Sequence, residues 1–387
     1  MKEGWEYKKI KEVANVFAGQ SAPQGDSNYC QKGIPFVKAG NLSELINGKP
    51  ENSIQNVSEQ VAKSHKLKLY KAGSVLFAKS GMSCMKGFVY TLKNDCYVVS
   101  HLAILSPKAI NSHYLNYYLC FYKPYTLIND AAYPTISLKD IEKLEIPVPT
   151  NNEQQSIVDY LDSAFAKIDT MKANAEKALN EAKALFQASL KEMLEPKEGW
   201  EGKTLGVVCA ITSLLVNPDE DQYKKLLHVG GANIISESGE LVNLKTSEEE
   251  KLISGKFLFD SEDVLYNKIR PYLKKVARPD FSGLCSADMY PLKHKDSITR
   301  DFLYYVLITK DFTDYAILNS GRAGMPKVNR QALFAYSFSL PSLNEQRKIA
   351  SALDSLKSKV DRLQENFDKI SQECDALKQA ILRQVFE

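Results

Sequence analysis

The side chains best suited to chemistry are cations, amides and hydroxyls that stand beside small residues in loops next to predicted strands. In the first half of the chain these are Lys79, Ser80, Ser83 and Lys86, and in the second half Asn267, Lys268, Arg270 and Tyr272. Arg and Lys can pair with guanine and Asn with adenine, and small neighbours let a loop approach a base edge or a phosphate closely. The chemistry that these loops could perform is therefore contact with DNA, and an ordinary solvated loop remains the alternative for each residue.

Further candidates of the same kind stand near two prolines or just after predicted strands. The proline groups are Asn129, Tyr133, Thr135 and Ser137 around Pro134, and Ser320, Arg322, Lys327 and Asn329 around Pro326. Lys38, Asn41 and Asn233 complete the predicted DNA contacts, because each follows a short apolar run that we expect to form a strand.

Catalytic motifs are missing from the sequence. It has no GxxxxGK[ST] nucleotide loop, no glycine-rich fingerprint for S-adenosylmethionine or a dinucleotide, no GxSxG and no HExxH. The Asn/Asp-Pro-Pro-aromatic motif of amino-methyltransferases is absent too, since NPDE at Asn217 does not match it. The 7 cysteines and 5 histidines are scattered, without the spacing of metal ligands. We therefore predict no catalytic residue, no metal site and no cofactor in this chain.

Composition indicates a globular protein with two or three domains, since the chain has 387 residues, 44% of them hydrophobic and 25% charged. No apolar run approaches the roughly 20 residues of a membrane-spanning helix, and the N-terminal residues do not resemble a secretory signal, so we expect no membrane contact and a cytoplasmic location. Residues 1–150 carry 18 Lys against 12 Asp and Glu, a net +6, whereas residues 196–341 are neutral with 19 of each sign. Charge alone does not decide whether DNA is the partner.

The most informative pattern is a long internal repeat. KEGWE at 2–6 recurs at 197–201, and both tryptophans of the chain lie in these copies. Near the end of each half the register is 192 residues: Pro134 matches Pro326, Glu153-Gln154 matches Glu345-Gln346, and Leu161-Asp162 matches Leu353-Asp354. Similarity in between is patchy, so each half has matching ends around a divergent middle.

Each half closes with a long heptad pattern. The predicted packing positions are Ile157, Leu161, Ile168 and Leu185 in the first series, and Ile349, Leu353, Val360, Leu363, Phe367 and Leu377 in the second. Apolar residues step by four and three for about five heptads without an interior Pro or Gly, which predicts two coiled-coil helices of roughly 40 residues, or about 60 Å each. The first series is rich in Ala and the second in Leu and Phe, so small residues can face large ones.

The fold class that follows is α+β. We predict two similar globular bodies, 1–150 and 197–341, each followed by a long helix, 151–196 and 342–387. An antiparallel pair of helices would place the bodies at opposite ends of a rod with approximate twofold symmetry. A long helical hairpin that merely stabilises a two-domain protein is the structural alternative.

The repeated IPVP and SLP turns, the two NEQ helix starts and the run DVLYNKIRPYL resemble the specificity subunit of Type I restriction-modification systems, and the resemblance covers essentially the whole chain. It implies that each divergent body is a target recognition domain for one half of a split DNA sequence, with the helices setting the gap. It also implies double-stranded DNA, two methyltransferase subunits and restriction subunits as partners, with S-adenosylmethionine, ATP and Mg²⁺ bound by those subunits and adenine N6 as the methylated atom.

Two rival interpretations belong to other classes. A fused methyltransferase is disfavoured by the missing motifs and the short length, whereas a coiled-coil scaffold that binds proteins rather than DNA, or an orphan copy of a specificity subunit, stays open. Neighbouring genes for an adenine methyltransferase and a helicase-nuclease would favour the specificity subunit. The bases that the bodies would read do not follow from the resemblance.

Overall fold

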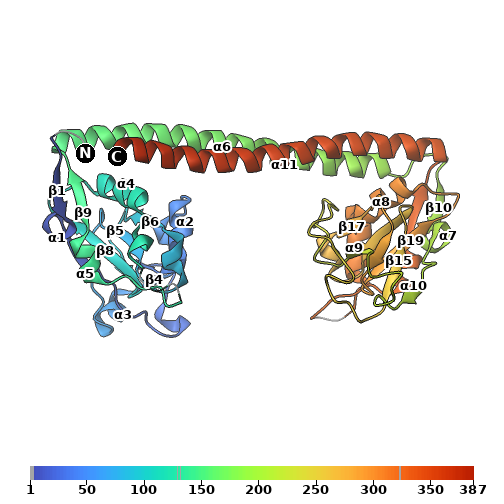
Figure 1. Cartoon of the computed structure of the whole chain (residues 1–387), viewed down its shortest axis with the longest axis horizontal. Coiled ribbons are helices and arrows are strands. Elements are labelled where there is room, and N and C mark those ends of the chain that lie inside the picture. Colours follow the sequence, from blue (N-terminus) through green and yellow to red (C-terminus); the bar gives the residue numbers. More distant parts are fainter. Residues whose placement is uncertain (1–3, 129, 131, 322–323) are drawn as a thin grey trace. The chain divides into compact units, whose positions relative to one another are not determined.

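The computed structural model describes residues 4–128, 130, 132–321 and 324–387, and divides them into two compact units (Figure 1). The first unit comprises Met1–Ala175 with Asp368–Glu387, and the second comprises Glu176–Phe367. Each long helix therefore contributes one of its ends to each unit. The α+β class that the sequence predicts is confirmed, since both units combine antiparallel sheets with helices. No helix among the described residues is long and apolar enough to cross a membrane.

The first unit begins with a body of short elements. In chain order these are β1 (Glu6–Lys9), α1 (Ile10–Val13), β2 (Ala14–Ala18), β3 (Ile34–Val37), α2 (Leu42–Ile46), β4 (Asn56–Val57), α3 (Glu59–Ser64), β5 (Val75–Ala78), β6 (Val89–Thr91), β7 (Tyr97–Val98), β8 (Leu102–Pro107), α4 (Ser112–Tyr122), α5 (Leu138–Lys143) and β9 (Glu145–Val148). The strands form an antiparallel sheet β2-β8-β5-β6, a small sheet β4-β3-β7 and the pair β1-β9.

The second unit repeats this plan. Its elements are β10 (Glu201–Thr204), α7 (Leu205–Val208), β11 (Cys209–Ala210), β12 (Leu215–Val216), β13 (Leu227–Val229), β14 (Lys245–Thr246), β15 (Lys256–Phe259), β16 (Asp263–Asn267), β17 (Val276–Ala277), β18 (Gly283–Cys285), β19 (Met289–His294), α8 (Arg300–Ile308), α9 (Lys310–Leu318), α10 (Arg330–Ala335) and β20 (Ser337–Leu340). Its four-stranded sheet β11-β19-β16-β17 matches β2-β8-β5-β6, and β10-β20 matches β1-β9. The remaining sheet differs, since it has five strands, β12-β15-β18-β13-β14, where the first unit has β4-β3-β7. The repeat in the sequence is thus a repeat of topology in two of the three sheets.

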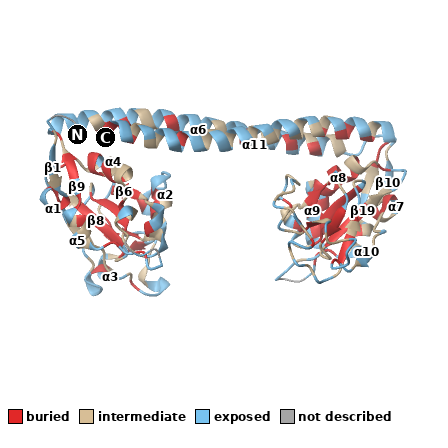
Figure 2. Ribbon diagram, viewed as in Figure 1, coloured by how far each residue is buried: buried red, intermediate tan, exposed pale blue. Residues whose placement is uncertain are grey.

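The tyrosine-rich helices α4 and α8 contribute buried residues to the core of each unit (Figure 2). Tyr114 of α4 is 0% exposed, and Tyr304 and Tyr305 of α8 are 2% and 0% exposed. Both helices begin at a capping residue: the Asn111 side chain accepts from the backbone of α4, and the Thr299 side chain accepts from the backbone of α8. Capping fixes where each helix starts and hence which tyrosines face the sheet.

Matching residues at the repeat ends join each body to a long helix. Trp5 Nε1 donates to Glu153 Oε1 at 2.8 Å, and Trp200 Nε1 donates to Glu345 Oε2 at 3.1 Å. The glutamines that follow these glutamates are 1% and 0% exposed. Gln154 Nε2 donates to Pro149 O at 2.9 Å and Gln346 Nε2 donates to Pro341 O at 2.9 Å, which closes the turn into each helix. The KEGWE and NEQ repeats therefore encode the same junction twice.

The two long helices, α6 (Asn151–Leu194) and α11 (Leu343–Phe386), have 44 residues each and lie where the heptad pattern predicts them. In the first unit the start of α6 shares a hydrophobic core with the end of α11, through Leu161 and Leu382 among others. In the second unit the end of α6 shares a core with the start of α11, through Leu190 and Leu353. The helices therefore run antiparallel, as predicted.

Eight of the ten predicted packing positions are buried or half-buried, and the prediction is wrong at two leucines. Leu161 and Ile168 are 0% and 4% exposed, and Ile349 and Leu353 are 7% and 0% exposed. Half-buried positions are Ile157, Val360, Leu363 and Phe367. Leu185 and Leu377, however, are 59% and 48% exposed, so neither packs between the helices.

The physical reason lies in a choice between neighbouring residues. The predicted heptad series and the series seen in the structure share Leu161 and Ile168 of α6. At every second position the two series differ by one residue. The helix buries Leu179 and Phe186, which are 4% and 8% exposed, in place of Ala178 and Leu185, because the larger pair removes more apolar surface from water. The same series brings cations to the edge of the contact, where Lys172 Nζ lies 3.6 Å from Asp375 and Lys378 Nζ lies 2.5 Å from Asp169.

Candidate nucleic-acid interface

In the first body, backbone hydrogen bonds hold the two predicted loops together. Residues 79–86 and 132–137 are here called the first loop pair. Lys79 N donates to His101 O at 2.9 Å, and Ile136 N donates back to Lys79 O at 2.8 Å. Gly81 N donates to Pro134 O at 3.0 Å, and Ser80 and Thr135 form an antiparallel bridge. Bonded residues more than 50 positions apart in the chain, such as Gly81 and Pro134, thus form one surface.

The second body contains the same arrangement in residues 268–275 and 324–329, here called the second loop pair. Lys268 N donates to Asp288 O at 3.2 Å, and Val328 N donates to Lys268 O at 3.0 Å. Arg270 N donates to Pro326 O at 2.8 Å, and Ile269 bridges Lys327. Each bond has its counterpart in the first loop pair, although the two loops share almost no side chains.

A backbone feature explains how both loops turn. Gly81 has φ 76° and Arg270 has φ 51°, in the left-handed region that favours glycine. Each residue begins a short 3-10 helix, Met82–Lys86 or Pro271–Leu273. A non-glycine residue in this conformation costs energy that the surrounding hydrogen bonds must offset, and such residues cluster at functional sites.

The loop pairs present several predicted contact residues to solvent. Lys86, Thr135, Arg270, Lys327 and Asn329 are exposed, and Tyr133 and Tyr272 are 81% and 50% exposed. Lys79, Ser80 and Ser83 are half-buried. Ser80 Oγ lies 2.7 Å from His101 Nδ1, so its hydroxyl already has a partner, and the Asn329 side chain caps α10 by accepting from Ala332 N at 2.8 Å. The exposed cations and Tyr133 are the best placed to meet a nucleic acid.

Other predicted contacts are occupied within the protein. Lys268 is 8% exposed, its ammonium donates to Ala287 O and lies 4.6 Å from the centre of the Tyr290 ring. Burial, with the nearby Lys327 charge, lowers the pKa of Lys268. Asn267 is also 8% exposed. These two side chains support the second loop pair from inside, and direct contact with DNA would require them to turn outward.

The matching asparagines Asn41 and Asn233 shape turns. Lys38 N donates to Asn41 Oδ1 at 2.9 Å, and Gly230 N donates to Asn233 Oδ1 at 2.8 Å. Asn233 Nδ2 donates in addition to Val242 O at 3.0 Å, so both ends of that amide are engaged. The Lys38 ammonium donates to Gln55 Oε1 at 2.5 Å. The Asn233 turn lies against the second loop pair, because Lys275 Nζ donates to Gly231 O at 2.5 Å. Asn129 and Arg322 lie outside the described residues.

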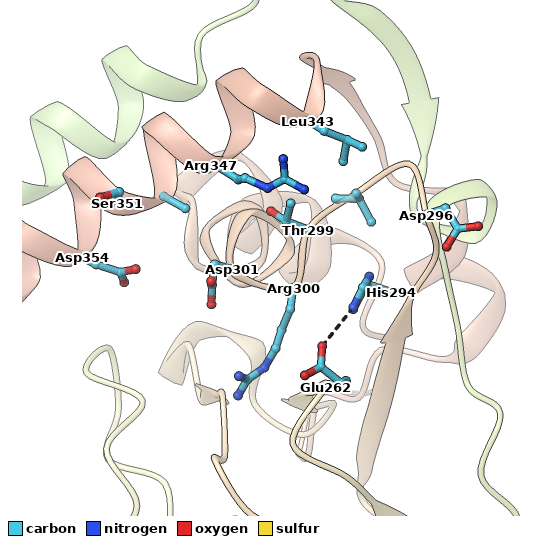
Figure 3. A pocket seen from close by; sticks show the side chains of 12 residues that line it. Glu262, His294, Asp296, Thr299, Arg300, Asp301, Leu343, Arg347, Ser351 and Asp354 are labelled. Atoms are coloured by element: carbon cyan, nitrogen blue, oxygen red, sulfur yellow. Dashed lines mark hydrogen bonds and ion pairs between the residues drawn. The ribbon is translucent and has the colours of Figure 1, made fainter.

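The second unit also contains a charged cleft of 690 Å³ that sequence analysis did not predict (Figure 3). Its walls come from the end of β19, the start of α8 and the first turns of α11, and they include Arg300, Arg347 and Asp354. Figure 3 shows His294 pointing toward Glu262, with 3.4 Å between His294 Nε2 and Glu262 Oε2. Both cations and carboxylates line the cleft, so it has no single sign of charge. Among the described residues no group of three His, Cys, Asp or Glu side chains could hold a metal ion.

Sequence reasoning missed the exposed methionines of the loop pairs. Met82 is 70% exposed and Met325 is 51% exposed. The sequence did contain a signal for Met325: it precedes Pro326 as Tyr133 precedes Pro134, 192 residues earlier.

Comparison with known proteins gives consistent matches. The family described as Type I restriction modification DNA specificity domain matches twice, over residues 2–181 and 197–372. The specificity subunit of the Type I restriction enzyme EcoDI from Escherichia coli is 27% identical over 353 residues, covering 82% of this chain and 78% of the relative. The StySPI specificity subunit from Salmonella potsdam is 23% identical and covers 99% of this chain and 89% of the relative.

Solved structures agree on the fold. A chain from a type I R-M system structure has a TM-score of 0.74 at 17% identity, covering 100% of this chain and 98% of its own. The HsdS subunit from Thermoanaerobacter tengcongensis has a TM-score of 0.51 at 18% identity, covering 100% and 97%. The duplicated body, the repeated helix junction and the double family match lead to one conclusion: this chain belongs to the family of Type I restriction-modification DNA specificity subunits, with one specificity domain in each half.

Proposed function

We propose that this chain is the DNA-recognition subunit of a Type I restriction-modification complex and that each body reads one half of a split target. The observation that carries the proposal is the duplicated loop pair: three equivalent backbone hydrogen bonds support two surfaces whose side chains differ. A shared frame with different side chains is what a protein needs to read two different half-sites, because frame contacts position the protein and side chains at base edges specify sequence.

The partner set belongs to the same proposal. Two methyltransferase subunits that bind S-adenosylmethionine would methylate adenine at N6, and restriction subunits would use ATP and Mg²⁺. This chain would catalyse no step itself. The antiparallel contact of α6 with α11 would set the gap between the half-sites and provide a docking surface for the methyltransferase subunits.

The direct test is to co-express the chain with the methyltransferase subunit encoded beside it and to map N6-methyladenine across the host genome by single-molecule sequencing. A split motif with a fixed gap is the expected result. A complex that forms but methylates no motif would contradict the proposal and favour a scaffolding role.

Exchange of one body gives the first prediction. Replacing residues 1–150 with the corresponding body of a relative is expected to change one half of the methylated motif and leave the other half and the gap unchanged. Each body has its own main sheet and its own loop pair, so its contacts do not depend on the other body's side chains. The readout is the methylation map of the hybrid complex. A change in both halves would show that the bodies do not read independently.

Arg270 gives the second prediction. Its exposed guanidinium in the second loop pair is the group best suited to pair with guanine, so Arg270→Ala is expected to weaken binding of the complete target by about 1–3 kcal/mol, or roughly 5- to 150-fold, and to relax one base position. Competition binding with single-base variants of the target measures both effects. Lys203→Ala on β10, outside the loop pair, is the matched control and should change affinity by less than about twofold. Equal losses for both variants would mean that Arg270 contributes charge alone.

A further inference from the structure

Each loop pair exposes large apolar side chains on both of its loops. In the first pair Tyr133 is 81% exposed, Met82 is 70% exposed and Met85 is 44% exposed. In the second pair Met325 is 51% exposed and Tyr272 is 50% exposed. A single exposed apolar residue on a protein surface is ordinary, but two on adjoining loops in both bodies form a repeated feature.

Tyr133 and Met325 occupy corresponding positions, whereas Met82 and Tyr272 lie one residue apart in the equivalent loops. Tyr133 and Met325 each stand directly before the proline whose carbonyl accepts from the loop across, Gly81 N to Pro134 O at 3.0 Å and Arg270 N to Pro326 O at 2.8 Å. Met82 and Tyr272 lie on the 3-10 helices that follow those donors. The hydrogen bond from Gly81 N to Pro134 O brings the loop that carries Met82 next to the loop that carries Tyr133. The two bodies differ in sequence here and still keep a large apolar side chain on each loop.

Cations flank both tips. The exposed Lys86 closes the 3-10 helix of the first tip, and Arg270 and Lys327 stand beside the second. Lys327 Nζ lies 3.3 Å from Asp288 Oδ1 and forms an ion pair with it. Lys86 and Arg270 form no ion pair with the described residues. An apolar tip between cations complements DNA, in which stacked apolar bases lie between two rows of phosphates.

We propose that Tyr133 and Met325 are wedge residues: each enters a base step of its half-site, with Met82 and Tyr272 filling the groove beside it, and partly unstacks that step. Flanking cations would hold the phosphates on either side. The inference rests on the proposed function and adds a specificity mechanism to it, because the cost of unstacking depends on the step that is opened. Each half-site would therefore contain one position selected by deformability rather than by hydrogen bonds.

The test uses the full chain in complex with its methyltransferase subunit and duplexes that carry 2-aminopurine at successive positions of each half-site. Fluorescence of 2-aminopurine rises when the base leaves the stack. We expect one enhanced position outside the methylated adenine in each half-site. Tyr133→Ala should abolish the enhancement in the first half-site only and weaken binding by about tenfold, whereas Tyr133→Phe keeps both. Met325→Ala and Met325→Leu should behave in the same way in the second half-site.

A pre-opened step provides the decisive control. An abasic site opposite the enhanced position removes the cost of unstacking, so wild-type binding should tighten there, and Tyr133→Ala should gain less. Ile46→Ala and Ile253→Ala remove exposed apolar side chains, 44% and 89% exposed, from the same bodies outside the loop pairs and should leave binding unchanged. If the wild-type complex binds its split target but no position is enhanced, or the alanine variants bind like wild type, the wedge is overturned alone. If the wild-type complex binds no split target, the proposed function falls as well.

Discussion

Arg278→Ala is expected to lower the free energy of unfolding of the second unit by about 2–4 kcal/mol. Arg278 follows β17 and joins the body to α11: Nη1 donates to Asp301 Oδ1 at 2.7 Å and Nη2 donates to Asp354 Oδ1 at 2.7 Å. Its side chain is 19% exposed, but the carboxylates are 49% and 42% exposed, so water takes over part of the lost interaction. The guanidinium also lies 4.2 Å from the centre of the Tyr304 ring, and that contact would be lost too.

The two tryptophans allow this effect to be measured by unit. Trp200 belongs to the second unit and Trp5 to the first, so in a Trp5→Phe background the tryptophan fluorescence comes from the second unit alone. Urea titration in that background should show a lower midpoint for Arg278→Ala. Arg278→Lys should recover only part of the loss, because an ammonium does not reproduce the fork that meets two carboxylates. Lys310→Ala breaks the exposed ion pair with Asp314 and should leave the urea midpoint almost unchanged. An equal shift for Lys310→Ala and Arg278→Ala would contradict this account.

Leu161→Ala is expected to lower the free energy of unfolding of the first unit by about 2–5 kcal/mol. Leu161 is 0% exposed and belongs to a core in which the start of α6 meets Leu382 and Phe386 of α11. Truncation would leave a cavity where body and both helices meet, so little relaxation is available. Urea titration in a Trp200→Phe background measures this loss, because the tryptophan fluorescence then comes from Trp5 in the first unit.

Leu377→Ala is the matched control for this prediction. Both leucines belong to heptad series in the sequence, both lie in the first unit and both substitutions remove the same atoms. Leu377 is 48% exposed, so its truncation should cost less than about 1 kcal/mol. A cost for Leu377→Ala as large as that for Leu161→Ala would show that the heptad series drawn from sequence spacing, rather than the series seen in the structure, packs in solution.

The sequence predicted which loops form the candidate site, but it did not predict which of their side chains are exposed. The pattern placed Lys79 near a strand end and Tyr133 near a proline, and both belong to the first loop pair. It did not separate Arg270, which is exposed, from Lys268, which is 8% exposed, although both are cations of one loop. Burial of Lys268 depends on Ala287 and Tyr290, which approach it only after the sheet has formed.

What the sequence by itself determined is the plan of the molecule: two similar α+β bodies with matching ends, a long heptad helix after each body, and an antiparallel pairing of the two helices. These features are local or periodic, and a repeat whose matching ends are offset by 195 and 192 residues exposes them without coordinates. What only the tertiary structure decided is which member of a neighbouring pair is buried, as with Phe186 and Leu185, and which polar groups are occupied, as with Asn233. The physical reason is that burial and hydrogen bonding are settled between segments distant in the chain, where a one-residue difference in packing changes which side chain meets water.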